Sequence, residues 1–276
     1  MRDYGTTEGG RGSMTTTPMR VGMIGLGAIG QGVLAQLAAM PEAAVDIVGV
    51  LVRDPSRPRP AGTPPVVGTV EALLALEPEV VVEVAGHEAL AQHGPAVLRS
   101  GRDLIAVSVG ALARPEVYDA LIAAARAGGA QITVASGAIG GLDAISAAAV
   151  GGLTRVTHTT RKPATTLLGA EGATLTEPRE LFRGTAREGV LAFPESINVA
   201  AAVSLAGVGL DRTEVVVVAD PAITRNRHEV VVEGAFGSLR FEIENVPTTA
   251  NPKTGRIVAM SIVRALLRRR APFVIG

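Results

Sequence analysis

The stretch MRVGMIGLGAIGQGVLAQLAAM, residues 19–40, constrains the fold most, because an apolar run meets a glycine-rich turn and then a run rich in Ala and Leu. This order predicts a strand, a tight turn and a helix. Gly25 would allow the turn, Gly27 would let the backbone approach a pyrophosphate, and Gly30 would let helix and strand pack closely. The residues predicted to bind a dinucleotide here are Gly25, Gly27, Ala28, Ile29 and Gly30.

A glycine motif alone is weak evidence in a chain with 33 glycines, but a second strand-like run, AVDIVGVLV, follows at residues 44–52. This run ends at Arg53 and Asp54, where the residue that contacts the adenosine ribose lies in a βαβ unit. Asp54 accepting from the ribose hydroxyls would favour NAD, whereas Arg53 meeting a 2′-phosphate would favour NADP. The sequence leaves this choice open.

Three further apolar runs, at 79–86, 103–110 and 130–137, are separated by helix-like segments at about 88–100 and 114–128. Near-continuous apolar runs are typical of parallel strands buried on both faces, and the carboxyl ends of such strands form the ligand crevice. Each residue after a run is on its own an ordinary loop residue, but their recurrence at one end of the sheet predicts a cofactor site. The residues predicted for it are Ala85, Gly86, His87, Ser108, Val109, Ser136, Gly137 and Ala138.

The pattern changes after residue 137. Runs at 155–163, 213–220, 228–234 and 237–245 alternate polar and apolar residues, which predicts half-buried strands of an antiparallel sheet, with one helix at 194–209. The expected fold is α/β, with an N-terminal Rossmann-type dinucleotide-binding domain over 19–137 and a second α+β substrate domain over 138–245. Residues 246–276 are expected to form a C-terminal helix that packs back on the first domain, and residues 1–18 a flexible leader.

The composition narrows the class of protein. The formal net charge is zero, so no basic footprint for nucleic acid or an anionic membrane is visible, and the chain lacks an apolar run of the ~18 residues that span a bilayer. The absence of cysteine excludes disulfides, thiolate nucleophiles and cysteine-ligated metals, and fits a reducing cytoplasm. We therefore expect a small-molecule substrate and no metal, nucleic acid or membrane. We also expect a homodimer through the second sheet, because the apolar strands at 213–220 and 228–234 would need covering.

Nine blocks occur in order from about residue 19 to 262: GLGAIG, VEVAGHEAL, VSVGAL, SGAIGGLDA, TTRKP, LFRGTAREGV, FPESINVAA, ADPAITRNRHEV and NPKTG. Together they closely resemble the L-aspartate dehydrogenase family. The resemblance implies NAD(P)-dependent oxidation of L-aspartate to iminoaspartate, or to oxaloacetate and ammonia after hydrolysis; the imine can feed NAD biosynthesis. One departure is Gly255, where the family usually has serine.

The resemblance also implies site residues. It makes His228 the catalytic residue with Asn226 beside it, and puts Asn198 and the SGA turn at 136–138 against the nicotinamide. The reaction needs a base near neutral pKa, which suits an imidazole. From local sequence alone, the favoured interpretation of His228 is an ordinary histidine at the mouth of a strand.

The other histidines have weaker cases: His158 is expected to be structural, His93 to lie on a helix surface, and His87 to stand at the crevice. A dicarboxylate substrate needs cations. The candidates are Arg161, Lys162 and Lys253, the two lysines being the only ones in the chain, and each is otherwise a solvated surface charge.

Two alternatives stand beside this interpretation. One is a related two-domain NAD(P)-dependent reductase of another imine or aldehyde, of the dihydrodipicolinate reductase or homoserine dehydrogenase type. The other is a non-catalytic NAD(H) sensor, which would not need a histidine beside Asn226.

Overall fold

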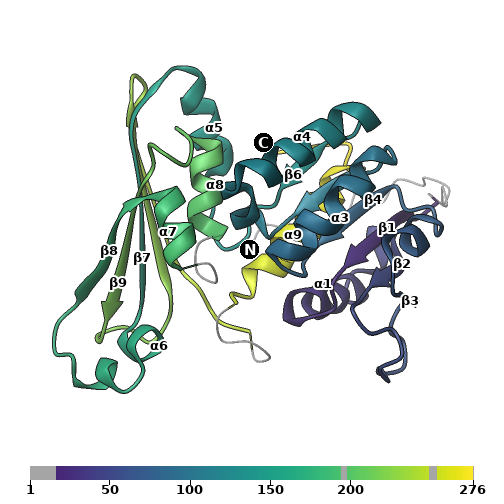
Figure 1. Cartoon of the computed structure of the whole chain (residues 1–276), viewed down its shortest axis with the longest axis horizontal. Coiled ribbons are helices and arrows are strands. Elements are labelled where there is room, and N and C mark those ends of the chain that lie inside the picture. The colour runs from purple at the N-terminus through teal and green to yellow at the C-terminus, as the bar shows by residue number, and fades with distance from the viewer. Residues whose placement is uncertain (1–16, 194–197, 249–253, 276) are drawn as a thin grey trace, which may run out of the picture.

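A computed structural model describes residues 17–193, 198–248 and 254–275, which form two sheets flanked by helices (Figure 1). Among these residues, no helix is both long and apolar enough to cross a membrane. Predictions that concern residues 1–16, 249–253 and the start of the helix expected at 194 lie outside the described residues.

The first sheet has six parallel strands in the order β3-β2-β1-β4-β5-β6. The Val- and Ile-rich runs form its centre, where Val21, Val80 and Leu104 are fully buried. The strand order reverses beside β1, and the carboxyl ends of the strands on either side of such a reversal leave a crevice for a ligand. The strands are β1 (Met19–Ile24), β2 (Val45–Leu51), β3 (Val66–Val67), β4 (Val80–Glu83), β5 (Asp103–Ala106) and β6 (Ile132–Val134).

Helices cover both faces of this sheet. On one face α3 and α4 pack together, and on the other α1 packs against the last helix of the chain, α9 (Ile257–Arg268). Ile262 and Leu266 of α9 are fully buried in the same core as Val33 of α1. The chain therefore returns from the second sheet to complete the first core. The bounds of the helices around this sheet are α1 (Ala28–Ala38), α2 (Val70–Leu74), α3 (His87–Arg99) and α4 (Pro115–Gly128), with short 3-10 turns at Pro41–Ala43 and Val109–Ala113.

The second sheet has five strands in the order β11-β10-β7-β9-β8. Its pairs are antiparallel except β7 with β9, which are parallel, so the prediction of an antiparallel sheet was wrong for that pair. Alternating polarity marks a half-buried strand but does not encode its direction. The strands are β7 (Leu153–Pro163), β8 (Arg179–Thr185), β9 (Glu214–Asp220), β10 (Arg227–Gly234) and β11 (Gly237–Glu244). β8 was not among the strands predicted from the sequence.

One face of the second sheet looks toward the first domain and is covered by α5 and α8 (Figure 1). Val156, Val230 and Val232 point to this side and are buried in a separate core. The segments on and beside this sheet are α5 (Leu142–Val150), α6 (Ala164–Leu168), α7 (Ala186–Ala192) and α8 (Asn198–Ala206), with a 3-10 turn at Glu171–Thr174.

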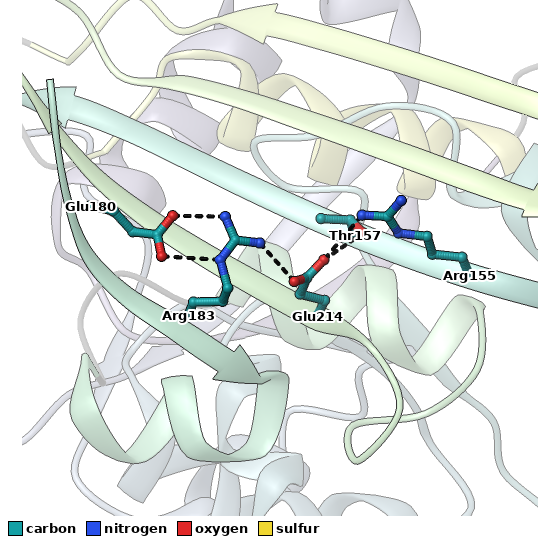
Figure 2. A network of polar contacts seen from close by, with 5 residues as sticks. All are labelled: Arg155, Thr157, Glu180, Arg183 and Glu214. Carbon is teal, nitrogen blue, oxygen red and sulfur yellow. Dashed lines mark hydrogen bonds and ion pairs between the residues drawn. The ribbon is translucent and has the colours of Figure 1, made fainter.

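The opposite face of the second sheet is charged. Figure 2 shows Arg183 donating hydrogen bonds to both carboxylate oxygens of Glu180 and to Glu214. The Glu214 carboxylate also accepts hydrogen bonds from Thr157 and Arg155. Val230 and Val232 of β10 point inward, whereas Val231 lies part-exposed on the outer face, opposite Arg240 of β11. Exposed ion pairs of this kind contribute only about 0–1 kcal/mol each to stability.

Candidate active site

A cleft of about 930 Å³ lies at the carboxyl ends of β1, β2 and β4, where the order of the first sheet reverses. This volume suits a dinucleotide. The predicted cofactor residues that line it are Gly25, Gly27, Arg53, Ala85, Gly86, His87, Ser108 and Asn198.

The glycine turn fits a closely approaching pyrophosphate. Gly25 has φ +101, and a Cβ there would lie 2.8 Å from the Cβ of Ala85. A Cβ on Gly30 would lie 2.7 Å from the carbonyl oxygen of Gly25, so the helix packs tightly against the turn. At Gly27, by contrast, a Cβ would meet nothing within 4 Å. That space faces the cleft, where a ligand can approach the backbone.

Glu83 fixes two loops of the cleft and was missed by the sequence analysis. Its side chain is fully buried at the end of β4. One carboxylate oxygen accepts from the backbone N–H groups of Ala85 and Gly86, at 2.7 and 2.9 Å, and from the Ser108 hydroxyl at 2.9 Å. The other accepts from the Ser108 N–H at 3.1 Å. A charged residue inside the apolar run VVVEV was the available signal.

Arg53 and Asp54 lie differently at the end of β2. Arg53 lines the cleft, whereas the Asp54 carboxylate accepts from the backbone N–H and the hydroxyl of Ser56, at 3.0 and 2.6 Å. These bonds lower the pKa of Asp54, the hydroxyl bond contributing most. Asp54 therefore caps its own turn in this structure.

A smaller cavity of about 130 Å³ lies between the first sheet and the second. Asn198, at the start of α8, lines both this cavity and the large cleft, and so joins them. The predicted site residues on its wall are Ile29, Val109, Ser136, Gly137, Ala138, Lys162, Asn198, Asn226 and His228. Gly255 and Thr254 also line it.

Asn198 connects the two domains. Its side-chain oxygen accepts from the backbone N–H of Gly110 and pairs with Nε2 of His87, each at 2.9 Å. Because that oxygen can only accept, His87 carries its proton on Nε2. Both bonds use the oxygen, so the amide nitrogen of Asn198 remains the donor that can serve a bound ligand.

His228 is the second residue of β10 and is only 5% exposed. Burial first, and then the positive charge of Lys162, lower its pKa to about 4. At neutral pH the imidazole is therefore uncharged and able to accept a proton.

His158 contacts His228 directly. It is fully buried on β7, and its Nε2 lies 3.2 Å from Nδ1 of His228, with the two ring planes 16° apart. Burial, followed by the neighbouring His228, holds the pKa of His158 well below its usual value. The sequence placed His158 correctly inside a strand but gave no sign of its partner.

The structure separates the predicted cations. Lys162 is 7% exposed and lines the small cavity, whereas Arg161 points to the opposite face of β7 and pairs with Asp220 at 3.5 Å. The prediction that Arg161 contacts the substrate beside Lys162 therefore does not fit this structure. Neighbouring residues of a strand point to opposite faces, so only one of the two can reach the cavity. Lys253 lies outside the described residues.

The structure also bears on the predictions for the glycine turn, for His93 and for a metal site. Ala28 and Gly30 do not line the cleft, although both belong to the turn and helix that shape it. His93, expected on a helix surface, is half-buried on α3, and the surface it occupies lines the cleft. The described residues contain no cluster of His, Asp and Glu side chains able to hold a metal ion.

Two family models match the chain. The model described as "Aspartate dehydrogenase, C-terminal" matches residues 143–269, and "Homoserine dehydrogenase, NAD binding domain" matches residues 25–135. The L-aspartate dehydrogenase of Pseudomonas aeruginosa is 45% identical over 258 residues, covering 90% of this chain and 96% of that protein. The L-aspartate dehydrogenase of Cupriavidus necator is 44% identical over 259 residues, covering 91% and 97%. This chain belongs to the aspartate dehydrogenase family.

Solved structures agree with this assignment. Aspartate dehydrogenase from Thermotoga maritima is 26% identical, with a TM-score of 0.76 over 94% of this chain and 99% of that one. A hyperthermophilic archaeal homoserine dehydrogenase shares the fold at 11% identity, with a TM-score of 0.63 over 93% of this chain and 99% of that one. The chain is therefore an NAD(P)-dependent amino-acid dehydrogenase with the expected α/β fold.

Proposed function

We propose that this chain oxidises L-aspartate with NAD⁺ or NADP⁺ to iminoaspartate, which water converts to oxaloacetate and ammonia. One observation carries the proposal: a neutral histidine and a lysine, His228 and Lys162, share the wall of a small cavity that opens through Asn198 onto the dinucleotide cleft. The names of the relatives supply the substrate, and the cavity supplies groups of the right chemistry for it.

The cleft residues fit a dinucleotide. The open space beside Gly27 receives the pyrophosphate at the start of α1, and Gly86, also without a neighbour within 4 Å of a built Cβ, leaves room at the next turn. When bound, the nicotinamide supplies the hydride acceptor. Asn198 lines both the cleft and the small cavity, and the turn at 136–138 lines the cavity, so both can orient the reacting ends.

His228 handles the proton. The substrate amine must lose a proton before its carbon can give up a hydride, and the imidazole accepts that proton on a ring nitrogen at the cavity wall. After that proton has passed to solvent, the same nitrogen takes a proton from the water that attacks the imine. A bound dicarboxylate would offset the charge of Lys162 and so raise the pKa of His228 toward its ordinary range.

Lys162 binds a substrate carboxylate. Its ammonium group is nearly buried, so its attraction for an anion is screened less than that of a surface lysine. This gives the site a preference for an acidic amino acid over an apolar one.

An amino-acid panel tests the proposal. The purified protein is assayed for NADH or NADPH formation at alkaline pH with L-aspartate, L-glutamate, L-alanine, L-homoserine and D-aspartate, and in reverse with oxaloacetate and ammonia. We expect turnover with L-aspartate to exceed that with the others at least 10-fold. Turnover of homoserine or of a cyclic imine without aspartate activity would assign the chain to the related reductases instead.

We propose in addition that the enzyme works in the cytoplasm as a homodimer, and that its imine product can supply NAD biosynthesis. The charged outer face of the second sheet is the dimer contact we propose, because no helix lies over it in Figure 1. Light scattering of the protein at micromolar concentration in low and high salt tests the dimer. A monomer in both conditions would contradict it.

A further inference from the structure

His158 stands behind His228, on the side away from the small cavity. In the sheet register His228 is opposite Thr160 and Val230 is opposite His158, so the two histidines are diagonal neighbours on one face. His228 lines the cavity, and His158 does not. The ring centroids are 5.4 Å apart, and the closest nitrogens are 3.2 Å apart.

This contact decides which nitrogen of His228 can do chemistry. Nδ1 is occupied by His158, so Nε2 is the ring nitrogen available to the cavity. Two proton arrangements satisfy the contact: either His158 donates to Nδ1, or the Nδ1–H of His228 donates to Nε2 of His158. Only the second arrangement leaves a lone pair on Nε2 of His228 for a proton from the substrate.

We propose that His158 is a positioning residue, which accepts the Nδ1–H hydrogen bond of His228 and thereby keeps the Nε2 lone pair directed at the cavity. The inference rests on the proposed function, because it presumes that His228 acts as a base. When Nε2 takes a proton, His228 carries hydrogens on both nitrogens, and the neutral His158 ring remains the acceptor that stabilises the cation. No bond other than the transferred N–H or O–H is broken.

The surroundings leave this role to His158. Among the described residues that line the cavity there is no carboxylate, and the one cation is Lys162, whose charge opposes protonation of His228. From the strand on the other side of β7, the inward residues Val215 and Val217 are apolar. The remaining polar side chains on the described wall are uncharged and belong to the turn after β6, to α8 and to the segments beside β10 and α9: Ser136, Asn198, Asn226 and Thr254.

A second observation supports the assignment. Nδ1 of His158 is buried and has no hydrogen-bond partner among the described residues, whereas its Nε2 lies against His228. Burying a polar ring with one nitrogen unsatisfied costs stability, and an apolar residue would avoid that cost. The ring therefore contributes something to the site that packing alone does not require.

A matched pair of variants tests the proposal. His158→Phe keeps a ring in the core and removes the acceptor, whereas His158→Gln can place its side-chain oxygen near the lost Nε2. We expect kcat for L-aspartate to fall at least about 10-fold in the Phe variant, while KM for aspartate and Kd for NAD(P)H stay within about 2-fold. The acid limb of its kcat profile should move to lower pH, because the His228 cation has lost its acceptor. The Gln variant should recover kcat to within about 3-fold of the parent.

Nitrogen-15 NMR of the histidine rings tests the same point without any turnover. Four histidines make the spectrum assignable by single substitutions. We expect His228 to carry its proton on Nδ1 in the parent and Gln proteins, and on Nε2 in the Phe variant. If no aspartate activity is found at all, the proposed function fails, yet this measurement still decides the role of His158.

Three results would overturn the inference: a Phe variant with the kcat and pH profile of the parent, a Gln variant as impaired as the Phe variant, or a parent His228 protonated on Nε2 at neutral pH. If His158→Phe does not bind NAD(P)H and so has not folded, His158→Met takes its place, since methionine adapts to irregular cores. The same loss of kcat and the same tautomer change are expected of it.

Discussion

The dinucleotide cleft and the cavity that we propose as the catalytic site differ in how their buried polar groups are satisfied. At the cleft, the buried Glu83 carboxylate accepts four hydrogen bonds from two loops, so its charge is satisfied. Near the cavity, His158 Nδ1, Thr160 Oγ1 and Asn245 Oδ1 are buried and have no partner among the described residues. The other two such atoms, Arg114 Nη2 and Arg179 Nε, belong to guanidinium groups that are ion-paired through another nitrogen. A satisfied network makes a rigid frame, whereas unsatisfied groups cost stability and are kept where chemistry needs them. This difference agrees with our proposal that the cleft binds the cofactor and the cavity holds the reacting groups.

Removal of the Glu83 carboxylate should have the largest effect on the cleft. Glu83→Leu leaves four donors without an acceptor, so the free energy of unfolding should fall by about 3 kcal/mol or more, and NAD(P)H should bind at least about 10-fold more weakly. Denaturant unfolding and fluorescence titration measure the two effects. The control Glu83→Gln keeps one acceptor oxygen and should cost less on both counts. Equal stability of the Leu variant and the parent would show that Glu83 is not the frame of the cleft.

Acid should act on the cavity in preference to the cleft. The folded-state pKa of His228 is about 4, below the ordinary 6.5, so the unfolded chain binds the extra proton between these values. The contribution of His228 to the free energy of unfolding is therefore fully present above pH 6.5. It falls by roughly 3 kcal/mol as the pH drops toward 4. The lowered pKa of His158 acts in the same direction.

Urea unfolding at several pH values measures that loss. The slope of stability against pH between 6.5 and 4 should flatten in His228→Gln, which cannot titrate. An unchanged slope in that variant would mean that His228 does not titrate abnormally in the folded protein.

Gly27→Ala should separate binding from stability. The added methyl group meets no protein atom within 4 Å but enters the space assigned to the pyrophosphate. We expect unchanged thermal unfolding and a KM for the cofactor about 10-fold higher. Gly151→Ala, whose Cβ would make only an ordinary 3.6 Å contact at the end of α5, is the matched control and should change neither quantity. A normal KM for the cofactor in the Gly27 variant would show that the pyrophosphate does not bind at this turn.

Arg53 should have the smallest effect, on the choice between cofactors. It lines the cleft, so Arg53→Ala should lower kcat/KM about 5-fold with NADP and less than 2-fold with NAD. Asp54 is bound to Ser56, so Asp54→Ala should affect NAD less than its place in the sequence suggests. A large, NAD-specific loss in the Asp54 variant would show that its carboxylate turns to the ribose when the cofactor binds.

The two regions also differ in how far the sequence predicted them. The cleft follows from local pattern, since a strand, a glycine turn and a helix place Gly25 and Gly27 without knowledge of any distant contact. The cavity depends on which face of a strand each residue occupies and on pairing across the sheet. Arg161 and Lys162 looked equivalent in the sequence until strand register put them on opposite sides.

Long-range pairing explains the residues that were missed. His158 and His228 are 70 positions apart, and their contact exists only because β7 and β10 pair antiparallel. The parallel pairing of β7 with β9 could not be read from alternating polarity either. Glu83 was visible as a charge in an apolar run, but its four donors come from loops that fold around it.

The most direct test of the account is His228→Ala assayed beside its parent with L-aspartate. His228 forms a cavity wall and does not line the dinucleotide cleft, so NAD(P)H affinity should stay within about 2-fold of the parent. At the same time kcat should fall on the order of 10²-fold or more, the scale of a lost acid–base group, and the acid limb of the pH profile should vanish. A folded variant that binds NAD(P)H normally and keeps near-parental kcat would contradict the account, and would make His87 at the cleft the next residue to examine.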